Sequence, residues 1–113
     1  MQPEDRIRPQ HILDEAQEAC GYIAELSFDE FILDGKTVRA VIRSIEVIGE
    51  AASKVSSDLR EAHMNIPWQQ IIGMRNRLIH VYFDIDHEVV WKTLKENLPP
   101  LIEQIQIILN TEK

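Results

Sequence analysis

The sequence has little that would cross-link the chain, break its helices or anchor it in a membrane. Of its 113 residues only Cys20 is a cysteine, which excludes an intrachain disulfide and favours a reducing, cytoplasmic compartment. The amino-terminal segment lacks the apolar stretch of a secretion signal, and no apolar run reaches the roughly 20 residues that span a membrane. Four glycines, five prolines and no alternating apolar run leave no strand signal. We therefore expect a helical, cytoplasmic protein with no membrane partner.

Positive charge is scarce overall but concentrated in the middle of the chain. Twelve Lys and Arg residues stand against nineteen Asp and Glu, a net charge of −7, and phosphate contacts with nucleic acid need clustered cations. Between residues 36 and 80, however, seven basic side chains stand against four acidic ones. This segment either carries a positive patch, or Arg39 and Arg43 merely solvate a helix face and pair with Glu46 and Glu50.

Apolar residues recur three and four positions apart along nearly the whole chain, which predicts helices throughout. The four long helices expected are residues 5–26, residues 36–55, a third from about Pro67 to Tyr82 or Phe83, and a last one that starts after Asp84 or Asp86 and reaches about residue 108. Pro99-Pro100 leaves the phase of the last apolar stripe unchanged, so we expect a kink or two abutting helices there.

Short helices are expected between the long ones. Ser27 followed by Glu30 has the spacing of a capping box, and Ser56 to Asp58 can cap a short helix that ends near His63. The predicted architecture is a single all-α domain over residues 1–113, an antiparallel four-helix bundle with one or two additional short helices.

The segment around Arg75 is unusual because a permanent cation falls in an apolar stripe. On a regular helix, Arg75 and Tyr82 share a face, two turns apart. The apolar residues of the same face are Trp68, Ile71, Ile72, Leu78 and Ile79. A guanidinium is costly to bury unpaired. Arg75 therefore either faces a groove that holds an anion, or it snorkels to solvent or pairs with an acidic residue of another helix.

His80 lies close to Arg75 in sequence, with Asn76 and Arg77 within one and a half turns. Cationic neighbours favour the neutral imidazole, which can accept a proton, and an arginine can stabilise charge on a phosphate. Together they suit phosphodiester cleavage without a metal. Arg75 and His80 are about 140° apart on one regular helix, however. Arg75 and His80 can therefore converge only if the helix distorts or if two chains share the site. The second possibility favours a homodimer.

Other candidate sites are weaker. The chain lacks the paired Glu-x-x-His motifs of a di-iron bundle, and a single cysteine cannot form a cysteine-based zinc site. Cys20 falls on an apolar stripe and is expected to be a small core residue. Trp68 and Trp91 are expected to anchor the core or an interface.

The order Arg75-Asn76-x3-His80-x-Tyr82 matches the Arg-x4-His-x-Tyr motif, and the chain resembles the HepT-like toxins of the HEPN superfamily over about residues 6–109. Flanking segments also resemble that family: Arg39-Ala40, Ile48-Gly49-Glu50-Ala51, Ile66-Pro67-Trp68, Ile72-Gly73-Met74, Asp84-Ile85-Asp86 and Val90-Trp91. The resemblance implies a dimeric helical bundle in which the motif helices line a composite groove. It also implies a metal-independent ribonuclease that needs no cofactor, with Arg75 and His80 as the catalytic pair.

The resemblance further implies a role and a partner. Such proteins are toxins of prokaryotic type VII toxin–antitoxin systems, and an MNT-type nucleotidyltransferase antitoxin uses ATP and magnesium to transfer AMP to the motif tyrosine, here Tyr82. Asn76 and Arg77 would support the active site. A second hypothesis is a non-catalytic helical module that binds a nucleotidyltransferase or a nucleotide. A third, a purely structural bundle, leaves Arg75 without a role.

Overall fold

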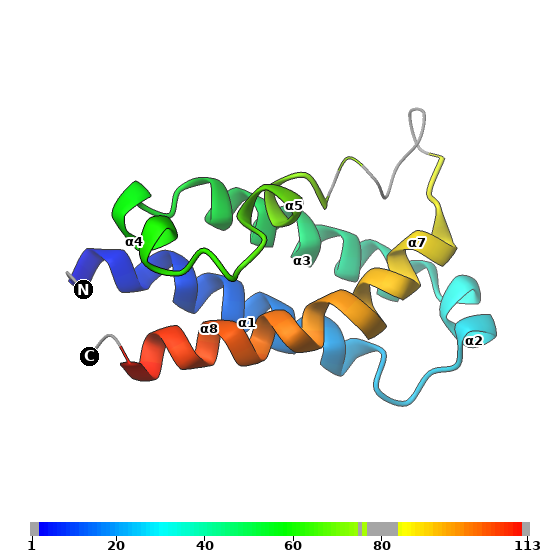
Figure 1. Ribbon diagram of the computed structural model, residues 1–113. Helices are drawn as coiled ribbons and strands as arrows, with labels where there is room; N and C mark the ends of the chain where they lie inside the picture. The colour runs from blue at the N-terminus through cyan, green and yellow to red at the C-terminus, as the bar shows by residue number, and fades with distance from the viewer. Residues whose placement is uncertain (1–2, 75, 77–83, 112–113) are drawn as a thin grey trace.

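The computed structural model describes residues 3–74, 76 and 84–111, and the regular elements in these ranges are helices (Figure 1). Their bounds are η1 Pro3–Arg6, α1 Ile7–Tyr22, α2 Phe28–Leu33, α3 Gly35–Ser53, α4 Ser57–Ala62, α5 Trp68–Ile72, α7 His87–Lys92, η2 Thr93–Asn97 and α8 Leu98–Thr111. The predicted all-α fold class is confirmed. None of the helices in these ranges is long and apolar enough to cross a membrane.

The long helical segments among the described residues are α1, α3 and the α7–η2–α8 run. Helix α1 contacts α3 along one side and α8 along another, and α5 packs onto α3. Helix α1 runs in the opposite direction to α3 and to the α7–η2–α8 run, and the two ends of the chain lie at the same end of the bundle (Figure 1). The predicted apolar stripe of the last helix is confirmed, because its members are all buried: Val90, Leu94, Leu98, Leu101, Ile105 and Ile108.

Side-chain caps fix where several helices begin. The capping box predicted for Ser27 and Glu30 is present at the start of α2. The Asp34 carboxylate caps α3 and accepts hydrogen bonds from the Thr37 backbone N–H at 3.1 Å and hydroxyl at 2.8 Å. These bonds favour the ionised form and lower the pKa of Asp34. Asp34 therefore ends one short helix and starts the next long one.

The helical run from α7 to α8 continues through Pro99-Pro100, with a π-helical turn, η2, directly before them. The Leu98 N–H donates to the Thr93 carbonyl, five residues back. Proline has no N–H to donate, and its ring crowds the carbonyl of the preceding turn in an α-helix. The wider π turn is a local adjustment next to these two prolines. The sequence pattern predicted a disturbance here but not its form.

The third predicted helix is interrupted at Gly73, where the sequence pattern predicted one continuous helix. Helix α5 ends at Ile72, Gly73 is its C-cap, and Met74 and Asn76 are helical again. Glycine is a poor helix former and a common terminator, which explains a break at this residue. The face on which Trp68 and Arg75 would align therefore does not extend through Gly73 as one regular helix. The later residues of the predicted helix lie outside the described residues.

Gly49 of α3 lies directly against the last turn of α5. A methyl group added at Gly49 would lie 3.3 Å from the Ile72 carbonyl oxygen and 3.4 Å from that of Ile71. Both neighbours are backbone atoms, so they cannot move aside as a flexible side chain would. The absence of a side chain at Gly49 is what allows the last turn of α5 to sit against α3.

Gly49→Ala is expected to lower the free energy of unfolding by about 1 kcal/mol, because crowding outweighs the gain in helix propensity. Gly21→Ala is the matched control: it also lies in a long helix, but nothing lies within 4 Å of the added methyl group. This control should be stabilised by up to about 1 kcal/mol. Urea unfolding measures both, and an equal gain for the two variants would contradict the close contact.

Candidate functional site

The structure places one of the five predicted site residues. Asn76 is exposed, and its backbone N–H donates to the Gly73 carbonyl at 3.1 Å. Arg75, Arg77, His80 and Tyr82 lie outside the described residues. The structure describes the segments on both sides of the motif. Met74, which follows α5, is the last described residue before Arg75, and Asp84, which precedes α7, is the first one after Phe83.

The chain that leads into the motif is held firmly by the bundle. Trp68, which starts α5, is 7% exposed, and its indole N–H donates to the His63 carbonyl at 3.1 Å. Ile71 and Met74 are 2% and 3% exposed. Because α5 also sits against Gly49 of α3, the residue immediately before Arg75 is fixed in the core. The start of the motif is thus anchored to the rigid part of the fold.

The chain that follows the motif is anchored in a similar way. The Asp86 carboxylate accepts a hydrogen bond from the Val89 backbone N–H at 3.1 Å and so caps α7, as the sequence predicted. Trp91 of α7 packs at 5.8 Å, ring centre to ring centre, from Phe28 and 5.2 Å from Phe31. Trp91 is therefore a core anchor, which confirms one of the two roles expected for it.

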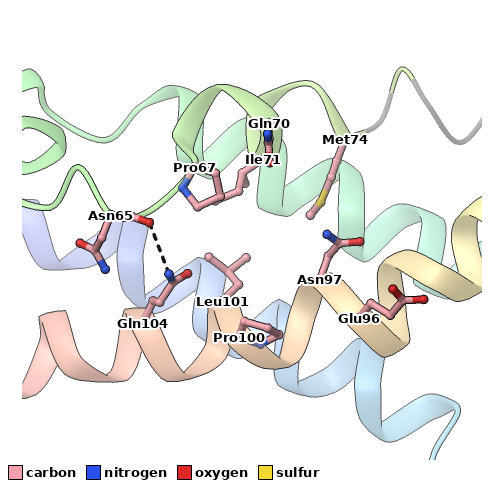
Figure 2. A pocket seen from close by; sticks show the side chains of 10 residues that line it. All are labelled: Asn65, Pro67, Gln70, Ile71, Met74, Glu96, Asn97, Pro100, Leu101 and Gln104. Atoms are coloured by element: carbon pink, nitrogen blue, oxygen red, sulfur yellow. Dashed lines mark hydrogen bonds between the residues drawn. The ribbon is translucent and has the colours of Figure 1, made fainter.

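A cavity of about 290 Å³ lies beside the chain that enters the motif, between α5 and the η2–α8 run (Figure 2). Pro67, Ile71 and Met74 form its wall on the α5 side, and Asn97, Pro100 and Leu101 form its wall on the opposite side. We call it the α5–α8 cavity. Sequence reasoning did not point to it, because its walls come from segments about 30 residues apart in the chain. A usable signal was the spacing of Asn97 and Gln104, which places two amides on one helix face beside the apolar stripe.

Two cations of the basic middle segment have structural roles. Lys54 lies 3.0 Å from the Glu50 carboxylate, one turn away on α3. The Arg60 guanidinium donates to the carbonyls of Ala52 at 3.0 Å and Ser53 at 2.8 Å, which lie at the carboxyl end of α3. Such carbonyls lack partners within the helix, so Arg60 acts as a cap. Arg39 and Arg43 are exposed on α3.

Cys20 behaves as the core residue that its position predicted. It is half-buried, and its Sγ lies 3.8 Å from the Leu94 carbonyl oxygen. Burial raises the pKa of the Cys20 thiol, which keeps it in the protonated, unreactive form at neutral pH. Within residues 3–74, 76 and 84–111, no group of three or more His, Cys, Asp or Glu side chains is arranged to hold a metal ion.

Comparison with known proteins decides the family. The family described as "Ribonuclease HepT-like" matches residues 12–108, a span that includes every residue of the Arg75-to-Tyr82 motif. The chain belongs to the HepT-like ribonuclease family. The resemblance inferred from the motif is thereby confirmed, and so is the assignment of the chain to a class of enzymes that act on RNA.

Curated relatives of this HepT-like protein are similar along most of their length. "Putative RNase TTE0752" of Caldanaerobacter subterraneus subsp. tengcongensis is 38% identical over 92% of this chain and 93% of its own. "Probable ribonuclease HepT" of Thermococcus cleftensis is 45% identical over 71% of this chain and 73% of its own. "Putative RNase MJ1380" of Methanocaldococcus jannaschii is 40% identical over 86% of this chain and 89% of its own. No solved structure matches the chain.

Proposed function

We propose that this HepT-like protein is a metal-independent endoribonuclease in which Arg75 and His80 act on the scissile phosphate. The observation that carries the proposal is the complete Arg75-x4-His80-x-Tyr82 motif in a chain that belongs to a ribonuclease family. The anchoring of both flanks supports it, because a catalytic pair needs a rigid frame to hold its geometry.

The chemistry requires only groups that this chain and the RNA supply. The His80 imidazole accepts the proton of the ribose 2′-hydroxyl, whose oxygen attacks the adjacent phosphorus atom. A P–O bond to the 2′-oxygen forms, the P–O bond to the 5′-oxygen breaks, and the protonated His80 returns the proton to that leaving oxygen. The products are a 2′,3′-cyclic phosphate and a 5′-hydroxyl. The Arg75 guanidinium stabilises the charge that builds on the phosphate oxygens.

Incubation of the purified protein with single-stranded RNA in EDTA tests this function. We expect discrete cleavage in EDTA and no cleavage of DNA of the same sequence, which has no 2′-hydroxyl to attack. Cleavage that appears only when a divalent metal ion is added would contradict the mechanism. The alternative function, a non-catalytic module that binds a nucleotidyltransferase or a nucleotide, predicts no cleavage under any of these conditions.

The biological role that we propose is the toxin of a type VII toxin–antitoxin pair. A second copy of the chain would bring two motifs to one groove, and the partner would be an MNT-type nucleotidyltransferase antitoxin. With ATP and magnesium bound to that partner, the Tyr82 oxygen attacks the α-phosphorus of ATP and pyrophosphate leaves. An anionic AMP group beside Arg75 would occupy the place of the RNA phosphate.

AMP transfer is expected on Tyr82 and not on Tyr22, the other tyrosine of the chain. Tyr22 is a suitable comparison because it is exposed and lies outside the motif; its hydroxyl donates a hydrogen bond to the Glu18 carboxylate, which raises the pKa of Tyr22. Incubation with antitoxin, ATP and magnesium should add one AMP to wild type and Tyr22→Phe, and none to Tyr82→Phe. Intact-mass and peptide mass spectrometry measure this, and AMP on Tyr22 would contradict the assignment.

A further inference from the structure

The α5–α8 cavity has the size and lining of a site for a flat, uncharged, hydrogen-bonding ring. Its volume of about 290 Å³ is near the lower limit, roughly 300 Å³, of small-molecule sites. Pro67 and Ile71 form one apolar wall, and Pro100 and Leu101 form the wall that faces it (Figure 2). A planar ring can lie between two such walls and bury both of its faces.

Side-chain amide groups lie at the two ends of the α5–α8 cavity. The Asn97 side chain points toward Met74 at one end, and Gln104 lies at the other end, where its amide donates to the Asn65 backbone carbonyl at 3.4 Å (Figure 2). A side-chain amide presents a donor and an acceptor next to each other, which matches the edge of a nucleobase and pairs with adenine through two hydrogen bonds.

The charges around the α5–α8 cavity favour a base over a phosphate. No lysine or arginine is among its described lining residues, and the carboxylate of Glu96 lies at its margin. A phosphate would meet a like charge there and, among the described lining residues, no compensating cation. A nucleotide at this place would therefore insert its base and leave its phosphate outside.

The position of the α5–α8 cavity connects it to the cleavage motif. Met74 lines the cavity and is joined by a peptide bond to Arg75. On the other wall, Asn97 is the last residue of the π-helical turn, and such turns often occur at functional sites. Proteins read single-stranded RNA through unpaired bases that leave the stack and enter pockets of this kind.

We propose that the α5–α8 cavity is a base-recognition site, which receives one unpaired nucleobase, preferentially adenine, of the RNA strand bound at the motif. This inference rests on the proposed nuclease function. Asn97 at one end and Gln104 at the other each hydrogen-bond to the edge of the base that faces them, and the proline, isoleucine and leucine side chains hold its faces. The site would give the enzyme a preferred base at a fixed position next to the bond that it cuts.

Cleavage mapping on a pool of random-sequence single-stranded RNA tests this site. In the wild type we expect one position near the cut to favour adenine over uracil by roughly five- to a hundredfold, the discrimination typical of a bidentate amide contact. Asn97→Ala and Gln104→Ala should lose most of this preference. Asn110→Ala and Gln106→Ala, which replace the same residue types at exposed positions of α8 outside the cavity, should keep it.

A binding measurement separates this inference from the proposed function. Fluorescence anisotropy with oligoadenylate and oligouridylate, on His80→Ala protein with and without Asn97→Ala, reports base preference without cleavage. A preference for oligoadenylate that Asn97→Ala abolishes would support the base-recognition site. If the wild type at the same time cuts no RNA, only the proposed nuclease function is overturned. Cleavage with a base preference unchanged by Asn97→Ala and Gln104→Ala would overturn only the site. A change in oligomeric mass without a change in base preference would instead make the cavity a subunit contact and also overturn the inference.

Discussion

Replacement of His80 with alanine is expected to lower the rate of RNA cleavage by about a hundred- to ten-thousandfold, the usual contribution of a general acid or base. The imidazole is the group proposed to take the proton of the 2′-hydroxyl, and alanine cannot replace it. The loss of activity counts as catalytic only if the variant remains folded. Initial rates on a labelled single-stranded RNA, together with circular dichroism, measure activity and folding.

His11→Ala is the matched control for this variant. His11 is exposed on α1, so the variant removes an imidazole of the same chain without touching the motif or the core. It should cleave RNA at the wild-type rate. Equal activity of His80→Ala and wild type would show that the proton is moved by another group, and equal loss in both variants would point to an indirect effect.

Replacement of Trp68 with alanine is expected to lower the free energy of unfolding by about 3–5 kcal/mol. The side chain is 7% exposed and begins the short helix that leads into the motif, so its removal leaves a large void beneath α5. The indole N–H also donates to the His63 carbonyl at 3.1 Å, and that bond joins the end of α4 to the start of α5. Urea unfolding monitored by circular dichroism measures the loss.

Trp68→Phe keeps the prediction testable if the alanine variant does not fold. Phenylalanine fills most of the space but cannot donate to the His63 carbonyl, so we expect a loss of about 1–3 kcal/mol. Because α5 positions the first residue of the motif, this variant should also cleave RNA more slowly. Wild-type stability in Trp68→Phe would contradict the role given to the indole hydrogen bond.

The fold class was predictable because the buried positions follow one helical period. The stripe from Val90 to Ile108 illustrates this, since each member that the spacing placed inward is buried. Helix starts were predictable where a side-chain oxygen caps them, as at Ser27 and Asp86. Such features depend on residues close together in sequence, which pattern reasoning can use.

Features that depend on contacts between distant segments were not predictable. The end of α5 at Ile72 accompanies a close packing of backbone against Gly49, more than 20 residues earlier in the chain. Periodicity alone favoured one helix through Gly73, because the apolar spacing continues beyond it. The π turn before Pro99 likewise follows from how two consecutive prolines are accommodated within a packed helix.

One part of the candidate site, the motif, was predictable from the sequence, and the other part, the α5–α8 cavity, was not. The motif from Arg75 to Tyr82 was identified in the sequence because its residue types and spacing are themselves the signal, and the family match confirms the resemblance. The α5–α8 cavity was not identified in the sequence, because Met74 and Asn97 line one cavity only when α5 and the η2–α8 run lie side by side. The assignment of roles to Arg75, His80 and Tyr82 remains a prediction from the motif.

The most direct test of the account is a double-mutant cycle in EDTA, with kcat/KM measured on one single-stranded RNA for wild type, Arg75→Ala, His80→Ala and the double variant. If the two residues act as a unit on one phosphate, the double variant should lose little more activity than the worse single variant. Independent losses that multiply in the double variant, or full activity in either single variant, would contradict the proposed catalytic pair.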